Sequence, residues 1–270
     1  MTSEAPATAE GDDGAGGKMP LLDHLIELRS RLLKSLLAIG AAFLLCLYFA
    51  RAILTVLVHP LIEAGLKKLI YTKPTEAFFV EMKVALFAAM MLAFPVIANQ
   101  LWKFVAPGLY RKEKRALLPF LFATPVLFAT GASFAYFITI PTALHFLFGF
   151  QRDLGGVQQE ALPATGEYIS FIMQFLMAFG VAFLLPILLM LVERAGLVTR
   201  QQLISARRYM IVGAFAIAAV FTPPDVLSQL LLAIPLVLLY EISIVAIWFT
   251  QRKRKTGAEE APVEPLEEAQ

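Results

Sequence analysis

No charged side chain interrupts the 25 residues 168–192, which read YISFIMQFLMAFGVAFLLPILLMLV. About 20 helical residues cross the hydrocarbon core of a bilayer, so this stretch is long enough to span a membrane once. Two further runs lack Asp, Glu, Lys and Arg: the 19 residues 84–102 and the 36 residues 116–151. We therefore expect the chain to cross a membrane several times as helices.

The composition supports the same class. Of the 270 residues, 59% are hydrophobic and 16% are charged, whereas soluble domains carry roughly 25% charged residues. A soluble domain of this size needs a polar surface that this chain cannot supply. The single cysteine, Cys46, lies in an apolar run, so an internal disulfide framework is excluded.

We predict an all-α polytopic membrane protein with six transmembrane helices. The predicted spans are residues 35–57, 84–102, 116–140, 168–192, 209–221 and 226–249. Arg51 falls in the first span and is expected to snorkel from near its end. Pro141 is expected to end the third span and to leave residues 142–150 at the interface. Pro186 and Pro235 lie inside later spans, where kinked packing would explain them.

The chain divides into three parts by composition. Residues 1–18 form an acidic N-terminal tail, residues 19–250 the six-span membrane domain, and residues 251–270 a tail that is basic and then acidic. Both tails have too few apolar residues to fold and are predicted to be disordered. The loop after the first span is long and carries Glu63, Glu76 and Glu81, so we expect it to fold rather than simply connect two spans.

Positive charges set the orientation. Of the 23 Lys and Arg residues, 17 flank the spans on the side that holds both termini and 6 fall on the other side. Cytoplasmic segments carry the excess of Lys and Arg. Both termini are therefore predicted to be cytoplasmic, as an even number of spans requires.

Two charged segments on the predicted cytoplasmic side are candidates for function. Residues 20–34, PLLDHLIELRSRLLK, form an amphipathic helix that carries Glu27 on its polar face. An interfacial helix in which Glu27 pairs with Arg31 explains this pattern as well as a binding site does. Residues 106–115, APGLYRKEKR, place Glu113 among basic residues and are also typical of a solvated charged loop.

Two further polar features lie close to the last span. Thr222, Pro223 and Asp225 have the spacing of a capping box with Thr222 as the N-cap, so a purely structural role is the default interpretation. Ser228 and Gln229 extend this polar patch into the following helix. Glu241 is a possible intramembrane carboxylate and hence a functional candidate, although its position would also let it reach the cytoplasmic interface.

Several motifs together resemble one known family. They are HLIELR at 24–29, WKFVAPGLY at 102–110 with Glu113 beyond it, AFGV at 178–181, and TPPD at 222–225 followed by Ser228 and Gln229. This pattern resembles TatC, the receptor subunit of the twin-arginine, or Sec-independent, protein translocase. The resemblance covers residues 19–249, and the motifs fall in the family's order on a six-span chain.

The resemblance implies a function, a location and a set of partners. TatC-like proteins lie in the bacterial inner membrane, bind twin-arginine signal peptides on the cytoplasmic face and recruit TatB and TatA in a multimeric complex. This machinery moves folded proteins across the membrane with the proton motive force. An arginine pair fits such a site physically, because guanidinium groups bind carboxylates in a bidentate manner.

Carried onto this chain, the resemblance assigns residues to two sites. The signal-peptide site would use Glu27 and Glu113, with Arg29 and Phe104 beside them. The contact with TatB or TatA would use Thr222, Asp225 and Gln229. One departure matters: the family commonly has a glutamate in the fourth span, in a Phe-Glu-x-Pro pattern, where this chain has Leu184. A mechanism that protonates that carboxylate cannot operate here.

Other functional classes are less well supported by the residues. A small-solute, proton-coupled secondary transporter that uses Glu241 is the alternative, but transporters often show inverted repeats and spans one to three do not resemble spans four to six. The sequence shows no nucleotide-binding loop, metal-ligand cluster or nucleophile–base arrangement. We therefore expect no enzymatic activity, no cofactor or metal, and no nucleic-acid partner.

Overall fold

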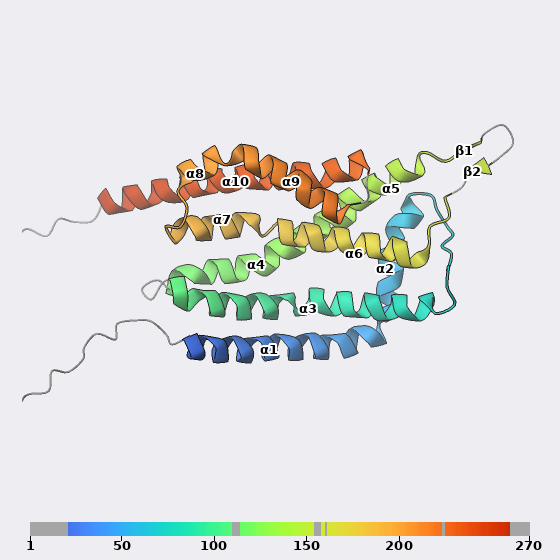
Figure 1. Cartoon of the computed structure of the whole chain (residues 1–270), viewed down its shortest axis with the longest axis horizontal. Helices are drawn as coiled ribbons and strands as arrows, with labels where there is room; N and C mark the ends of the chain where they lie inside the picture. The colour runs from blue at the N-terminus through green and yellow to red at the C-terminus, as the bar shows by residue number, and fades with distance from the viewer. Residues whose placement is uncertain (1–20, 110–113, 154–157, 160, 223–224, 260–270) are drawn as a thin grey trace, which may run out of the picture.

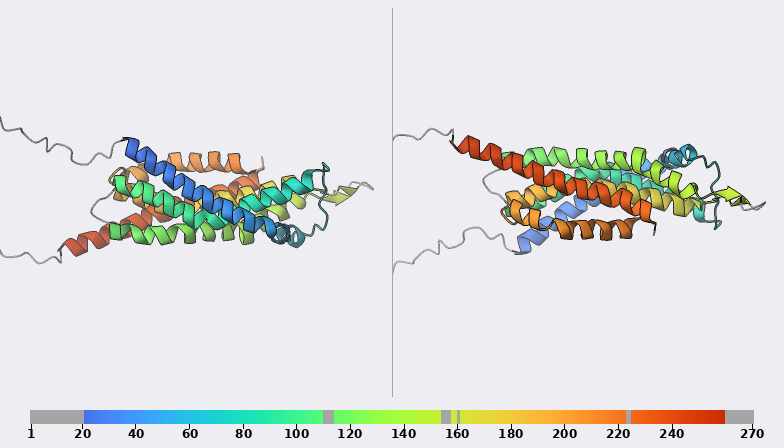
Figure 2. Two further views of the ribbon diagram at one scale, coloured as in Figure 1. Left: turned by 90° about the horizontal axis from the view of Figure 1, so that it is seen from below. Right: turned by 90° about the horizontal axis from the view of Figure 1, so that it is seen from above.

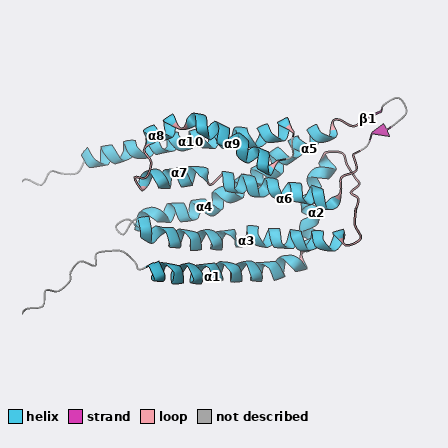
Figure 3. Cartoon of the chain, viewed as in Figure 1, coloured by secondary structure: helices cyan, strands magenta, loops and turns pink. Residues whose placement is uncertain are grey.

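Apolar helices account for most of the described chain (Figures 1 and 3). The structure is a computed structural model that describes residues 21–109, 114–153, 158–159, 161–222 and 225–259. In chain order the elements are α1 (Leu21–Tyr48), α2 (Ala50–Glu63), α3 (Glu76–Leu109), α4 (Lys114–Phe134), the π-helix η1 (Ala135–Thr139), α5 (Ile140–Phe148), the short antiparallel strands β1 (Arg152–Asp153) and β2 (Gln158–Gln159), α6 (Thr165–Ala182), α7 (Leu185–Arg194), α8 (Arg200–Ser205), α9 (Arg207–Phe221) and α10 (Val226–Glu259).

The predicted six spans correspond to helices of the structure. In the described chain, five helical segments are long and apolar enough to cross a membrane: Leu25–Tyr48, Glu76–Phe104, Phe120–Phe148, Thr165–Arg194 and Val226–Arg252. The predicted fifth span corresponds to α9, which has 15 residues. The all-helical, six-span prediction is therefore confirmed, while several of its boundaries are wrong.

The first predicted span, residues 35–57, is wrong in its bounds. Helix α1 begins at Leu21 and ends at Tyr48, so Arg51 lies in the first turn of α2 and not within a span. The chain bends at Phe49, where small residues pack closely, because Cys46 and Ala50 lie in one buried cluster with alanines of α3. Apolar side chains continue on both sides of Phe49, so the sequence pattern does not mark such a bend.

Pro141 acts differently from the prediction. It does not end the third span, because it lies in the first turn of α5, where a missing N–H is tolerated. At Pro186 the fourth span is interrupted, because α6 ends at Ala182 and α7 begins at Leu185, as expected for a proline that kinks the span. Helix α10 runs through Pro235 and continues to Glu259, past the predicted domain boundary at residue 250.

The long helices lie side by side and define two ends of the bundle. Helix α1 lies at one edge against α3, and α9 and α10 lie at the opposite edge (Figures 1 and 2). We call the end where α1 begins, α3 finishes and α10 extends outward the terminal end. The far end carries α2, the β1–β2 pair and the first turns of α3 and α6.

Helix α6 forms the centre of the bundle. Its largest fully buried side chains are Phe175 and Phe179. Two glycines allow α4 and α6 to approach closely: a Cβ on Gly131 would lie 2.4 Å from the Phe179 carbonyl oxygen, and one on Gly180 would lie 2.6 Å from the Phe128 ring. Small residues at helix contacts are typical of membrane bundles, where close van der Waals packing drives association.

Apolar side chains also cover the outer surface. On α1, Leu36, Leu37 and Leu44 each expose more than half of their surface. A water-soluble protein would not expose such a continuous apolar belt. The belt is the surface that a membrane protein presents to lipid.

Two tyrosines fix α2 across the far end. Pro60 lies inside α2 and cannot donate a hydrogen bond to Val56, which leaves the Val56 carbonyl without its helical partner. The Tyr136 hydroxyl of η1 donates to this carbonyl oxygen at 2.7 Å, and the buried Tyr168 hydroxyl of α6 donates to the Leu57 carbonyl at 3.0 Å. The loop after α1 is therefore folded, as its length predicts.

Candidate functional site

Glu27 lies near the start of α1, at the terminal end. It forms an ion pair with Arg31 one helical turn later, as the i, i+4 spacing predicts. Both nitrogens that Arg31 uses, Nε at 3.1 Å and Nη2, donate to the same carboxylate oxygen, Glu27 Oε1. The other oxygen, Oε2, is shielded from solvent and has no hydrogen-bond partner among the described residues.

The ion pair is only partly accessible. The side chains of Arg31 and Glu27 expose 18% and 21% of their surface. A fully exposed pair contributes little to stability because water screens it, whereas this pair is screened less. Partial burial makes the unbonded oxygen of Glu27 more significant, since a buried acceptor without a donor is costly.

Of the other three residues of the predicted signal-peptide site, the structure describes two. Arg29 lies two residues after Glu27 on α1 with an exposed side chain, and Phe104 lies half-buried in the last part of α3. Since α1 packs along α3 in the opposite direction, both belong to the terminal end. Glu113 lies outside the described residues.

A hydrogen-bonded link fixes the end of α3 to α4. The Trp102 indole Nε1–H donates to the Thr124 hydroxyl at 2.8 Å, and this hydroxyl donates to the Phe120 carbonyl at 2.7 Å. The tryptophan of the WKFVAPGLY motif thus positions the helix that leads to Glu113.

The predicted capping box at 222–225 is wrong in its register. Thr222 caps the end of α9, and its hydroxyl donates to the Ala218 carbonyl at 2.9 Å. Asp225 is the residue before α10, and its Oδ1 accepts the Ser228 backbone N–H at 2.7 Å. Asp225 therefore performs the N-cap role expected of Thr222. Pro223 lies outside the described residues.

Gln229 of α10 links α10 to α9, the helix before this turn. Its side-chain Nε2 donates to the Phe215 carbonyl of α9 at 3.2 Å. Thr222, Asp225 and Gln229 are therefore brought together at one end of the α9–α10 pair.

Glu241 is paired and does not lie isolated among apolar side chains. Its Oε2 accepts a hydrogen bond from Arg207 Nη2 at 2.7 Å, and both side chains expose more than a third of their surface. Arg207 is the first residue of α9. The pair joins the start of α9 to α10, and its accessibility agrees with an interfacial position.

Leu184 occupies the short link between α6 and α7. Its backbone is helical in conformation, and its side chain is half-buried. The position that carries a glutamate in the family pattern is therefore apolar, and the described residues include no group of three or more His, Cys, Asp or Glu that could hold a metal ion.

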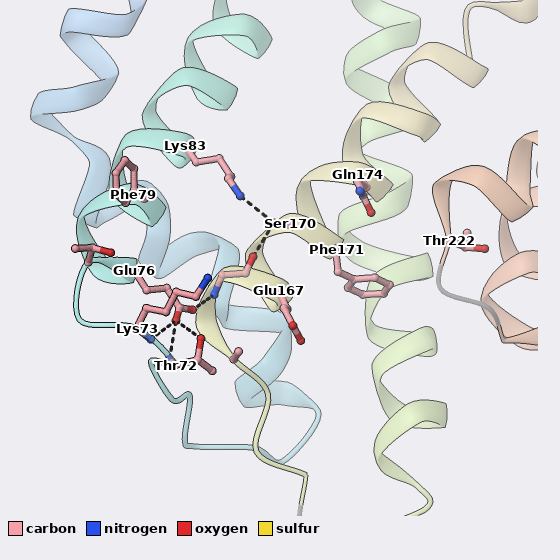
Figure 4. Close-up of a pocket in the computed structure, with 13 residues that line it drawn as sticks. Thr72, Lys73, Glu76, Phe79, Lys83, Glu167, Ser170, Phe171, Gln174 and Thr222 are labelled. Atoms are coloured by element: carbon pink, nitrogen blue, oxygen red, sulfur yellow. Dashed lines mark hydrogen bonds between the residues drawn. The ribbon is translucent and has the colours of Figure 1, made fainter.

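The sequence reasoning missed a polar cluster at the far end. Glu76, the first residue of α3, accepts hydrogen bonds with both oxygens: Oε1 from the Gly166 N–H at 2.6 Å, and Oε2 from the Thr72 N–H at 2.6 Å and hydroxyl at 2.8 Å and from the Lys73 N–H at 3.3 Å. Figure 4 shows this carboxylate joining the loop before α3 to the start of α6. An acidic residue in the first turn of a helix was the signal available.

A pocket of about 640 Å³ opens beside this cluster (Figure 4). Lys83 of α3 donates to the Ser170 hydroxyl of α6 at 3.2 Å along one wall. Glu167 and Gln174 of α6 and Thr222 line other parts of it. These residues lie far apart in sequence, so no local motif marks the pocket.

Comparison with protein families gives a match over most of the chain. A family model described as "Sec-independent protein translocase protein (TatC)" matches residues 23–235. Three proteins with the name Sec-independent protein translocase protein TatC are similar to this chain. The protein of Magnetococcus marinus is 47% identical over 248 residues, which cover 90% of each chain. That of Aquifex aeolicus is 44% identical and covers 88% of this chain and 98% of its own, and that of Escherichia coli K12 is 39% identical and covers 83% and 86%.

Solved structures agree with this result. Two crystal structures of the twin-arginine translocase receptor TatC superpose on the chain with TM-scores of 0.74 and 0.75. They are 42% and 43% identical to it and cover 84% and 83% of its length, with 99% and 98% of their own chains matched.

Proposed function

This chain belongs to the TatC family of Sec-independent protein translocase proteins, and we propose that it is the receptor and core scaffold of a twin-arginine translocase. In this role it binds twin-arginine signal peptides and recruits TatB and TatA to move folded proteins across the membrane with the proton motive force. The fold class and the family together support a protein-transport role over an enzymatic one.

The observation that carries the receptor role is the state of Glu27. A carboxylate at the terminal end keeps one shielded oxygen without a donor among the described residues. A guanidinium group from a signal peptide would supply that donor in a charge-assisted hydrogen bond. We propose that Glu27 and Glu113 together bind the arginine pair, with Arg29 and Phe104 at the edge of the site.

The transporter alternative loses its main support. It depends on Glu241 as a proton-carrying group within the membrane, and Glu241 is instead paired with Arg207 in an accessible position. With Leu184 in the fourth span, a proton-driven step in this chain has to use other groups.

We propose that the turn between α9 and α10 contacts TatB or TatA. Gln229 uses one amide hydrogen for the Phe215 carbonyl, and a glutamine amide has a second hydrogen and a carbonyl oxygen for a partner. Thr222 caps the end of α9 and Asp225 caps the start of α10, so both ends of the turn are fixed by hydrogen bonds. Gln229 lies within the candidate span Val226–Arg252, where a polar side chain gains from a polar partner in another helix.

The proposed location is the bacterial inner membrane, with the terminal end in the cytoplasm. The distribution of Lys and Arg supports this orientation. In a Cys46→Ala background, a cysteine at position 112 should be protected from an impermeant reagent added outside, and a cysteine at position 155 should react. Labelling at position 112 from outside would contradict the orientation.

Crosslinking tests the receptor role directly. A twin-arginine signal peptide with a photo-crosslinker should form a product with the chain in membranes, and a twin-lysine version should not. Removing one partner of a charge-assisted bond costs about 1.5–3 kcal/mol, so Glu27→Gln and Glu113→Gln should each lower binding roughly tenfold to hundredfold. Glu63→Gln, an exposed glutamate of α2 at the far end, is the control. Wild-type crosslinking by both variants, with the twin-lysine peptide still inactive, would refute this site.

A further inference from the structure

Arg31 bonds to only one of the two carboxylate oxygens of Glu27. An arginine facing a carboxylate often forms two parallel bonds, one to each oxygen. Here Nε and Nη2 of Arg31 both donate to Oε1, and Oε2 takes neither. One oxygen of Glu27 is therefore fixed by Arg31, whereas the other is shielded from solvent and has no donor among the described residues. A signal-peptide guanidinium reaches this oxygen only by displacing the atoms that cover it.

We propose that Arg31 is a positioning residue for signal-peptide recognition: it holds Glu27 by Oε1 and presents Oε2 to the guanidinium of an incoming arginine. This inference rests on the proposed receptor function. Both side chains lie on the same face of α1 one turn apart, and each is about four-fifths buried. The rotamer of Glu27 is thus set before the peptide arrives, which reduces the ordering cost of binding.

The opposite role for Arg31 has a different consequence. If Arg31 competed with the signal arginine for Glu27, it would cover the acceptor that the peptide needs, and removing it would strengthen binding. The observed geometry favours positioning, because Arg31 leaves Oε2 without a bond. The preference for arginine over lysine distinguishes Arg31 from a residue that only stabilises α1, since a structural pair acts on folding and not on this preference.

The test is a double-mutant cycle on signal-peptide crosslinking in membranes that contain the full translocase. Arg31→Gln should lower crosslinking of a twin-arginine peptide by about fivefold to tenfold relative to folded protein, a coupling typical of residues in direct contact. Arg31→Lys should restore part of this loss, because lysine keeps the charge but lacks the planar pair of donors. Arg31→Gln in a Glu27→Gln background should cause no further loss.

Lys34→Gln is the matched control. It removes the same charge from an exposed position one turn further along α1, so it should leave crosslinking at the wild-type level. The ratio of twin-arginine to twin-lysine crosslinking should fall for Arg31→Gln and stay constant for Lys34→Gln. The folded amount of each variant, measured by size-exclusion profile in detergent, normalises every value.

Each outcome has a defined meaning. Stronger crosslinking by Arg31→Gln would overturn the positioning role in favour of competition. Unchanged crosslinking, or an equal loss in the Glu27→Gln background, would show that Arg31 does not act through Glu27, and the inference would be wrong while the receptor site stood. If Glu27→Gln itself has no effect on crosslinking, Glu27 does not bind the signal peptide, and both the proposed site and the role of Arg31 are wrong.

Discussion

Two glutamates at opposite ends of the bundle use their carboxylates in opposite ways. At the far end, both oxygens of Glu76 accept hydrogen bonds from the chain. At the terminal end, Glu27 has one oxygen bound to Arg31 and one shielded oxygen that accepts no hydrogen bond from the residues the structure describes. Both residues carry the same charge near a helix start, so residue type alone does not separate them.

The difference shows how to distinguish a structural carboxylate from one available to a ligand. A fully bonded carboxylate gains nothing from an added donor, whereas a half-bonded one recovers the cost of its unsatisfied oxygen when a donor binds. We therefore propose that the far end serves rigidity and the terminal end serves recognition. The predictions below test that division.

The largest effect is expected at the terminal end. The double change Glu27→Gln and Glu113→Gln should nearly abolish export of twin-arginine substrates, because the basic side chains around Glu113 repel arginine once both carboxylates are neutral. Export of a reporter to the far side of the membrane measures this loss. Normal export by a stably inserted double variant would show that signal peptides are not recognised at this end of the molecule.

The second effect concerns the rigid centre between the two ends. Gly131→Ala should destabilise the protein by about 1–3 kcal/mol, because the added Cβ meets the backbone of α6, which cannot move aside cheaply. Gly213→Ala is the control, since a Cβ added there would meet no atom within 4 Å beyond its chain neighbours and the local backbone of its own helix. Thermal unfolding in detergent gives both values. Equal stability of the two variants would show that α4 and α6 are not closely packed.

The turn between α9 and α10 should separate stability from partner binding. Asp225→Ala removes the N-cap bond to Ser228 and should lower stability by about 0.5–2 kcal/mol. Gln229→Leu should cost less stability, since it loses one long bond, but should weaken co-purification of TatB or TatA. Full co-purification with Gln229→Leu would assign this turn a structural role alone.

The smallest effect is expected for Glu76→Gln. The change weakens the contacts that join the loop before α3 to the start of α6, so trypsin should cleave more rapidly at Lys73, while signal-peptide crosslinking stays normal. Glu81→Gln is the control, because Glu81 pairs with a highly exposed Arg51. A loss of crosslinking with Glu76→Gln would contradict the separation of the two ends.

The sequence predicts those features that depend on neighbours along the chain. The charge-free runs of 19, 36 and 25 residues identify the second, third and fourth spans. The i, i+4 spacing predicts the Glu27–Arg31 pair that the structure contains. The confirmed family assignment rests likewise on continuous motifs.

Features that depend on residues distant in sequence were not predicted. Glu241 meets Arg207, and Glu76 meets Gly166, only after the helices have packed. The bend at Phe49 is missed because apolar side chains continue on both sides of it. The N-cap was assigned to Thr222 because both Thr222 and Asp225 are suitable capping residues, and only the backbone decides between them.

The π-helix η1 has a consequence for how the fold tolerates a change in chain length. A π-turn bonds each residue to one five positions away and so contains one residue more than an α-turn. Buried side chains occur on both sides of it, with Phe128 and Ala132 before it and Ala143 and Leu144 after it. The extra residue is confined to η1. We therefore expect a variant with one residue removed here to keep these side chains buried, because an uninterrupted α-helix would replace the π-turn.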